Sequence, residues 1–172
     1  VEIDPGTKAS NVAGLGFGPF ISTALAQGSQ FMGIAPSFVR HGSPAESAGM
    51  QRGDLIYEVN GTTLTTANYQ SYMSSLYANP SGTYSFKFLR YEPNGKGGYD
   101  HNAYEASSVA SGVHTYNPVL HASILTDPDN SATKIGYLVY ESFDLYSQEF
   151  LEATIEEFVE EGITDLILDL RF

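Results

Sequence analysis

The stretch GSPAESAGMQRGDLIYEVNG, residues 42–61, predicts a short helix, a strand and a tight hairpin turn in direct succession. Ser43 can accept a hydrogen bond from the first helical turn, Pro44 sits where no N–H is needed, and Gly49 ends the helix. Residues 55–59 form a β-prone run, and the NG pair that follows tolerates the positive φ angles of a two-residue hairpin. The stretch therefore predicts a compact helix–strand–turn unit.

Further strands and a second helix surround this unit. Residues 20–25 and 31–39 are β-prone runs separated by a polar turn, and residues 84–91 alternate apolar and polar side chains as a half-buried strand does. Over residues 67–78 the apolar side chains recur at helical spacing. These side chains are Tyr69, Tyr72, Met73, Leu76 and Tyr77.

A glycine-rich sequence, Gly14-Leu15-Gly16-Phe17, precedes these elements. Two glycines around an apolar residue allow successive N–H groups to converge into a nest that accepts a carboxylate, with the two apolar side chains lining a pocket beneath it. An ordinary glycine-rich turn is the alternative. A dinucleotide-binding fingerprint is disfavoured, because Pro19 stands where a third glycine belongs and no strand-to-helix transition follows.

The second half of the chain predicts a strand–helix–strand unit. Residues 135–140 are a nearly continuous apolar run, typical of a strand covered on both faces. Residues 147–161 form an amphipathic helix with an acidic outer face, and residues 166–170 predict a second buried strand. Residues 92–133 are rich in Gly, Asn, Ser and Pro and predict a linker, within which residues 112–125 are compatible with a strand.

The GLGF sequence, residues 42–61 and the order of the elements together resemble a PDZ domain over residues 12–91. The resemblance implies a peptide binder, in which an extended peptide adds beside residues 18–25 and its C-terminal carboxylate rests on the N–H groups of the GLGF sequence. Peptide side chains would then face the helix at residues 67–78. The candidate peptide-binding residues are Gly14, Leu15, Gly16, Phe17, Tyr69, Tyr72, Met73 and Leu76.

Two features bear on this expected site. A stripe such as Tyr69, Tyr72 and Met73 is also what a helix shows when it only packs on a core, and this alternative stays open. Pro19 has no N–H, so it cannot donate a hydrogen bond to an added strand, and the first rung of the expected pairing would lack its donor.

The second half carries its own likeness. KIGYL at residues 134–138, Phe143, the acidic helix and GITDLILDLR at residues 162–171 resemble the opening of the catalytic core of the C-terminal processing (tail-specific) serine peptidases. A PDZ domain followed by this core is that family's arrangement. The implied fold class is α+β: a PDZ-like partly open β-barrel with two helices, then a βαβ fragment of an α/β peptidase core. The expected segments are an N-terminal tail at 1–11, the PDZ domain at 12–91, the linker at 92–133 and the start of the core at 134–172.

The family resemblance also sets expectations about activity. The family uses a serine nucleophile and a lysine base, and both lie downstream of the position equivalent to Phe172. None of the four lysines matches the base by the resemblance. We therefore expect this chain to bind protein C-terminal tails without cutting them, as part of an exported bacterial protein of the periplasm or cell envelope. The alternative is a stand-alone PDZ-type binding or scaffold module.

The amino-acid composition excludes or disfavours several classes of partner and site. Twenty acidic against eight basic residues give a net charge of −12, which disfavours nucleic acid and anionic membrane surfaces as partners. The chain has no cysteine, which excludes disulfides and Cys-based zinc sites, and no apolar run long enough for membrane insertion. We expect no cofactor and no metal, since His114 and His121, seven residues apart on strand-like sequence, would project to opposite faces.

Two further expectations concern the C-terminal part. Asp165 and Asp169 are candidate catalytic carboxylates, because they lie at the end of a strand predicted to be buried, where the active sites of α/β proteins gather. A role in hydrogen bonding at the strand end is the simpler interpretation. The strand at residues 166–170 would present an unpaired apolar edge, so self-association through residues 135–172 is expected.

Overall fold

The computed structural model describes residues 10–78, 81–143 and 147–171. It divides into two compact units, the first spanning Asn11–His114 and the second including Thr115–Phe172. The described residues contain three helices, and the other regular elements are strands. The strands form open sheets and do not close into a barrel. The expected α+β class is confirmed.

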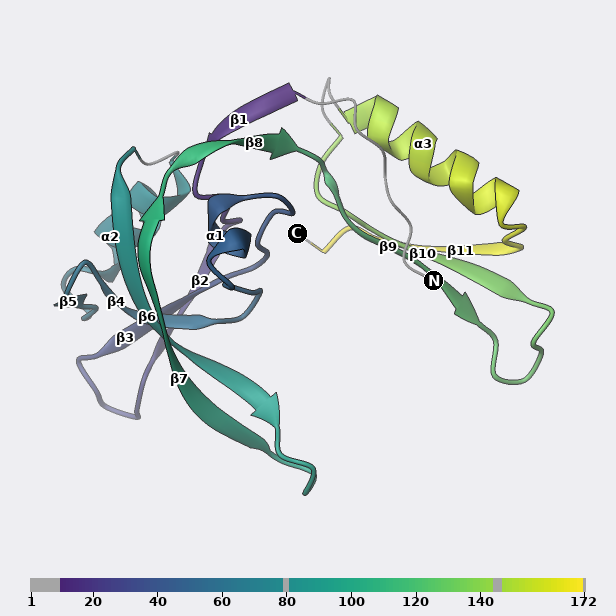
Figure 1. The fold of residues 1–172 in the computed structure, drawn as a ribbon. Helices are drawn as coiled ribbons and strands as arrows, with labels where there is room; N and C mark the ends of the chain where they lie inside the picture. The colour runs from purple at the N-terminus through teal and green to yellow at the C-terminus, as the bar shows by residue number, and fades with distance from the viewer. Residues whose placement is uncertain (1–9, 79–80, 144–146, 172) are drawn as a thin grey trace. The chain divides into compact units, whose positions relative to one another are not determined.

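The first unit is built on one large sheet (Figure 1). Its strands run in the order β2-β3-β4-β6-β7, with β5 paired to β4, while β1 and β8 form a separate two-stranded sheet. The elements are β1 (Ser10–Gly14), β2 (Phe20–Ala24), β3 (Met32–Pro36), α1 (Pro44–Ser47), β4 (Leu55–Val59), β5 (Thr62–Thr63), α2 (Tyr69–Tyr77), β6 (Thr83–Pro93), β7 (Tyr99–Ala110) and β8 (Gly112–Tyr116).

The helix–strand–turn unit forms as the sequence predicts. The Ser43 hydroxyl caps α1 by accepting a hydrogen bond from the Glu46 N–H at 3.2 Å, and Pro44 occupies the first turn. Asn60 and Gly61 have φ angles of 50° and 74°, which are the positive values that a two-residue hairpin between β4 and β5 requires. Local chemistry alone therefore accounts for this part of the fold.

The core of the first unit lies between the large sheet and its helices. Helix α2 packs on β2 and β3, and α1 lies against β7. The buried apolar residues include Leu15, Phe17, Ile34, Ala45, Met50, Ile56, Val59, Leu64, Leu76, Phe86 and Phe88. The GLGF sequence thus contributes two of its residues to this core.

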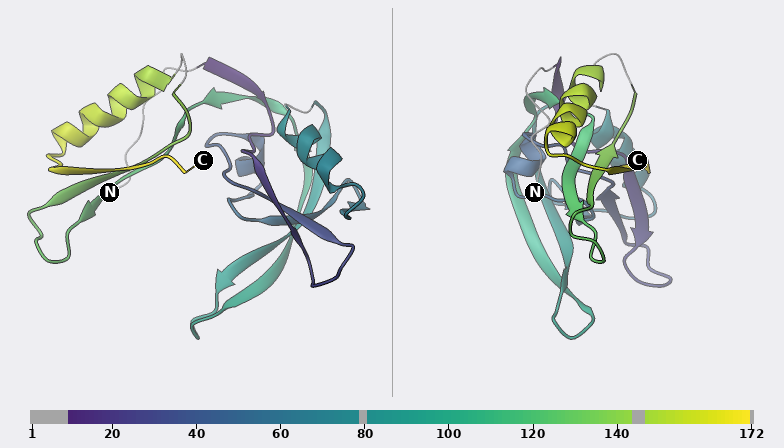
Figure 2. Two further views of the ribbon diagram at one scale, coloured as in Figure 1. Left: turned by 180° about the vertical axis from the view of Figure 1, so that it is seen from behind. Right: turned by 90° about the vertical axis from the view of Figure 1, so that its right-hand side faces the viewer.

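The region expected to be a linker, residues 92–133, contains the end of β6 and all of β7, β8 and β9 (Val119–Thr126). The strand expected as possible at residues 112–125 corresponds to β8 and most of β9. Strand β7 pairs with β6 from Thr83–Ala110 to Pro93–Tyr99, and Figure 2 shows this hairpin reaching beyond the rest of its sheet. Most side chains of β7 are exposed, so the strand has no apolar alternation in its sequence and is held by its ladder to β6.

The second unit is a three-stranded sheet with one helix. Strands β10 (Lys134–Tyr140) and β11 (Asp165–Asp169) are parallel neighbours, β9 pairs with β10 on the other side, and α3 (Ser147–Glu160) covers one face (Figure 1). This confirms the strand–helix–strand unit. Its core contains Val119, Ala122, Leu138, Tyr140, Phe150 and Phe158.

Strand β11 is more exposed than its sequence suggests. Leu166, Ile167 and Leu168 are 45%, 47% and 44% exposed, although an apolar run of this kind indicates a buried strand. The reason is its position at the edge of the sheet, where only β10 pairs with it. None of the helices in the described residues is long and apolar enough to cross a bilayer.

Candidate functional site

The loop of residues 14–18 is fixed through its carbonyl groups. The Leu15 carbonyl accepts a hydrogen bond from the Ala45 N–H of α1 at 2.9 Å, and the Gly16 carbonyl accepts one from the Arg40 N–H at 2.8 Å. The Gly18 N–H donates to the Phe38 carbonyl at 3.0 Å. Because these bonds hold the loop against residues 38–45, its backbone conformation is set by the fold.

Two N–H groups of this loop, unlike its carbonyl groups, are not used in holding the loop in place. Phe17 and Val39 form an isolated antiparallel bridge whose two hydrogen bonds are made by the flanking residues, so the Phe17 N–H points away from Val39. Within residues 10–78, 81–143 and 147–171, neither the Gly16 nor the Phe17 N–H donates to any acceptor. Two adjacent backbone donors are therefore available to a ligand.

Glycine is required at two loop positions by close approach. Gly16 has a φ of +87°, and a Cβ there would lie 2.1 Å from the Ser43 Cβ. A Cβ on Gly18 would lie 2.5 Å from the Phe38 ring. A side chain at either position would push the loop off its support.

The side chains of the GLGF sequence lie beneath the loop. Leu15 is 1% exposed and Phe17 5% exposed, and the Phe17 ring contacts the rings of Phe20 and Phe86 at centroid distances of 5.4 and 5.7 Å. The structure thus places both side chains in the core. Gly16 bears one of the two donors, and Gly14 lies at the end of β1.

Strand β2 continues from the loop as a free sheet edge. Its pairing with β3 alternates, and the Ser37 N–H donates to the Pro19 carbonyl at 2.8 Å. Pro19 therefore faces β3, while the N–H and carbonyl groups of Phe20, Ser22 and Ala24 point to the unpaired edge. The missing N–H of Pro19 removes no donor from that edge, so the expectation of a lost first rung is corrected.

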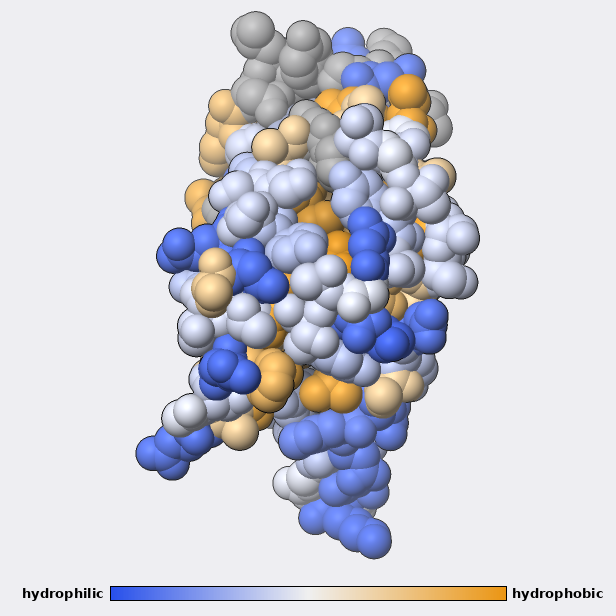
Figure 3. Space-filling view, turned by 90° about the vertical axis from the view of Figure 1, so that its left-hand side faces the viewer, coloured by the Kyte–Doolittle hydropathy of each residue, from blue (hydrophilic) through white to orange (hydrophobic). Residues whose placement is uncertain are grey.

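Helix α2 runs beside this edge and carries the predicted stripe. Tyr69, Tyr72 and Met73 are partly buried and pack against the core from the helix, whereas Leu76 is 2% exposed and belongs to the core itself. Figure 3, drawn from the side of α2, shows apolar surface interrupting a mostly polar face. The structure brings the helix, β2 and the loop together within one unit.

His114 is a neighbour of this loop that sequence reasoning missed. It lies on β8, is 6% exposed, and its Nε2 would be 3.4 Å from a Cβ on Gly16. Its Nδ1 is 3.4 Å from the Gly112 carbonyl, and Nε2 has no partner in the described part of the chain. The sequence holds no signal for this placement, because it depends on the long-range pairing of β1 with β8.

We expect His114 to make the stability of the first unit depend on pH. Burial lowers its pKa, with a smaller contribution from the positive charge of Arg40, while the Gly112 carbonyl opposes both. In the unfolded chain the ring takes up a proton near the ordinary value of about 6.5, so the unfolded state binds more protons below that pH. We expect the free energy of unfolding to fall as pH drops below about 6.5, and His114→Gln to flatten this dependence in urea titrations. An unchanged slope in the variant would contradict this assignment.

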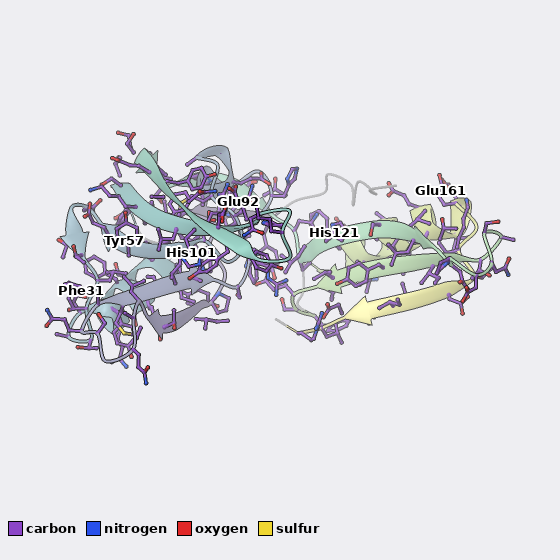
Figure 4. The ribbon with its side chains drawn as sticks, turned by 90° about the horizontal axis from the view of Figure 1, so that it is seen from below. Phe31, Tyr57, Glu92, His101, His121 and Glu161 are labelled. Carbon is purple, nitrogen blue, oxygen red and sulfur yellow. The ribbon has the colours of Figure 1, made fainter. Side chains whose placement is uncertain are left out.

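The other candidate groups are accounted for by local contacts. His121 is exposed on β9 (Figure 4), where its Nε2 lies 3.0 Å from the Ser123 hydroxyl. No cluster of three His, Asp or Glu side chains that could hold a metal occurs in the residues that the structure describes. Asp169 accepts hydrogen bonds from the Arg171 guanidinium at 2.8 and 2.5 Å and from the Tyr137 hydroxyl at 3.0 Å, and the guanidinium contributes most to a strongly lowered pKa.

The chain is similar to known proteins in sequence and in fold. Residues 39–78 match the PDZ domain family. A crystal structure of a protein from Bacteroides fragilis assigned to the S41 proteases matches with a TM-score of 0.69 and 25% identity, over 94% of this chain and 41% of that one. A photosystem II D1 C-terminal processing protease matches in fold, with a TM-score of 0.51 and 19% identity over 99% of this chain and 44% of that one. A search of curated proteins finds no match.

The chain spans less than half of either protease, so the likeness covers a part of those proteins. The PDZ match covers α1, the β4–β5 hairpin and α2, and the loop of residues 14–18 and β2 lie in the same unit. The chain therefore matches the PDZ domain family over residues 39–78 and resembles the C-terminal processing (S41) proteases in structure over a part of their length.

Proposed function

We propose that the first unit captures the C-terminal tail of a protein substrate for a C-terminal processing serine protease. The observation that carries the proposal is the pair of N–H donors on Gly16 and Phe17, which lie at the start of the free β2 edge. A carboxylate accepts from converging backbone donors, and the residues before it can extend the sheet along β2. Binding a flexible tail costs ordering entropy, so an affinity on the order of micromolar is expected.

A titration with two forms of one peptide tests the proposal. A labelled peptide with an apolar C-terminal residue is added as the free acid and as the C-terminal amide. The free acid should bind at least tenfold more tightly, because a charge-assisted hydrogen bond to backbone donors contributes about 1.5–3 kcal/mol. Equal affinities would show that the C-terminal carboxylate does not contribute to binding, and would contradict the proposal.

The β2 edge has its own matched test. Ser22→Pro removes one N–H that points to the free edge, whereas Ser22→Ala keeps it. We expect the proline variant to bind the acid peptide about tenfold more weakly, as loss of one hydrogen bond implies, and the alanine variant to bind like the original chain. A proline variant with unchanged affinity would place the peptide elsewhere.

We further propose that this chain binds tails without hydrolysing them. A lysine base needs a lowered pKa, yet the Glu58 carboxylate hydrogen-bonds Lys87 and raises its pKa. Lys134 donates to the Glu161 carbonyl at 2.6 Å, and Lys96 is exposed in the turn between β6 and β7. Incubating the chain with the acid peptide should give no fragments by mass spectrometry, and cleavage would overturn the proposal.

Export to the periplasm or cell envelope is proposed as the setting of this activity. The support is the resemblance of residues 134–171 to the tail-specific peptidases. Fractionation of cells that express the natural gene should recover the protein outside the cytoplasm, and cytoplasmic recovery would contradict the proposal.

Self-association is proposed for the second unit. Strand β11 presents an edge without a partner strand in the described residues, and its apolar side chains are nearly half exposed. Sedimentation should show dimers at high concentration, and Ile167→Lys should weaken them because a charge on an edge strand opposes pairing. A monomer at every concentration would contradict it.

A further inference from the structure

A buried ring nitrogen lies beside the loop that bears the free N–H donors. The Nε2 of His114 is buried without a hydrogen-bond partner in the described residues, and a Cβ on Gly16 would sit 3.4 Å from it. Buried polar atoms of side chains are normally satisfied, so an exception calls for a physical explanation. The unpaired Nε2 lies beside the backbone that offers two donors to a carboxylate, and this position suggests an explanation.

The contact at the other ring nitrogen identifies the tautomer. Nδ1 lies 3.4 Å from the Gly112 carbonyl, and a carbonyl oxygen can only accept, so Nδ1 carries the hydrogen in the neutral ring. Nε2 then presents a lone pair, which would repel a carboxylate that came close to it. Protonation at Nε2 replaces this lone pair with an N–H donor and a positive charge.

On the two paired strands beside the loop, β1 and β8, His114 is the group whose ordinary pKa lies between about pH 5 and 8. Neither β1 nor the rest of β8 carries a group that titrates between about pH 5 and 8. The positive charge of Arg40 acts on the ring. His41 and Glu46, from the segment before α1 and from α1, are exposed and lie 3.0 Å from each other, and Glu105 on β7 is exposed.

We propose that capture of a peptide carboxylate by this loop is coupled to uptake of one proton from solvent at His114 Nε2. The inference rests on the peptide function proposed above and adds a pH-sensing residue to that site. The bound carboxylate supplies negative charge near the ring, which favours the imidazolium form, and by reciprocity the imidazolium form binds the carboxylate more tightly. In the free protein, burial and Arg40 keep the ring neutral at neutral pH.

The size of the effect follows from linkage. If the bound carboxylate raises the pKa of His114 by about one unit, affinity rises up to about tenfold as pH falls through the titration. The peptide carboxylate itself titrates near 3.5 and stays ionised above about pH 5. Tail capture would therefore strengthen on mild acidification, the opposite of the effect on fold stability.

The test measures affinity for the labelled acid peptide from about pH 8 to about pH 5.5, with circular dichroism confirming the folded state at each pH. The original chain should gain about fivefold to tenfold in affinity, and His114→Gln should change less than about twofold. His101→Gln, an exposed histidine on β7, is the matched control and should behave like the original chain. Loss of the pH dependence in the His101 variant as well would overturn the assignment to His114.

Calorimetry on the unaltered protein tests the proposal even if the His114 variant does not fold. Titrations near pH 6 in two buffers of different ionisation enthalpy should show proton uptake with the acid peptide. Affinity independent of pH with no proton uptake would overturn the proposal while leaving peptide capture intact. An acid peptide that does not bind at any pH, or binds no better than its amide, would instead remove the proposed function.

Discussion

Replacing Gly16 by alanine should abolish most peptide binding and destabilise the first unit. The new Cβ would meet the Ser43 Cβ at 2.1 Å and its hydroxyl at 2.5 Å, at a φ of +87° that alanine adopts poorly. Strain of about 1–2 kcal/mol from the backbone and about 1–3 kcal/mol from overpacking gives a loss of about 2–5 kcal/mol in unfolding free energy. Because Gly16 also bears one of the two donors, affinity for the acid peptide should fall more than tenfold.

Gly95→Ala is the matched control for the Gly16 substitution. Gly95 has a similar φ of +70° but nothing within 4 Å of its Cβ position, so it carries the backbone strain alone. Urea unfolding should show a loss of about 1 kcal/mol, with peptide affinity unchanged. Similar results for the two variants would mean that the contact with Ser43 does not constrain the loop.

Replacing Asp54 by alanine should cost about 3 kcal/mol of unfolding free energy. Asp54 is 1% exposed and accepts hydrogen bonds from the Arg90 Nε and Nη2, both at 2.7 Å, and from the Gln51 N–H at 2.8 Å. Removing one partner of a buried pair leaves the other charge without compensation, which typically costs about 3–5 kcal/mol, and the partial exposure of Arg90 reduces this figure. Urea titration measures the change.

The effect should extend to the peptide site. Arg90 also donates to the Gly49 carbonyl at 2.7 Å at the end of α1, and α1 in turn holds the Leu15 carbonyl through Ala45. Glu58→Ala, which breaks the more exposed pair with Lys87 at 2.8 Å, is the control and should leave the midpoint nearly unchanged. A loss at Glu58 as large as that at Asp54 would show that burial does not distinguish the two pairs.

The sequence predicts those parts of the fold whose causes are local. Ser43, Pro44 and the Asn60–Gly61 turn act through bonds and φ angles within a few residues, and the structure contains the helix and hairpin that they indicate. The strand–helix–strand unit at residues 134–170 is equally readable, because burial on both faces of β10 and on one face of α3 leaves a clear apolar pattern.

The remaining features could not be predicted from the sequence, because they depend on pairing between residues that are far apart in the chain. Strand β7 has almost no apolar alternation, since the β6 ladder rather than a core holds it, and β1 is defined by its pairing with β8 across about a hundred residues. The exposure of β11 depends on its place at a sheet edge, which a run of leucines does not report. His114 approaches Gly16 only through the β1–β8 pairing, so no spacing rule could have found it.

The position of the peptide can be read directly from amide resonances of the isotope-labelled chain. Adding the acid peptide should shift the Gly16 and Phe17 amides and should slow hydrogen exchange at Phe20, Ser22 and Ala24, whose N–H groups point to the free edge of β2. The amide form of the peptide should leave the Gly16 and Phe17 signals in place. Unshifted Gly16 and Phe17 signals at saturation with the acid peptide, or protection confined to β7, would contradict capture of a C-terminus by this loop.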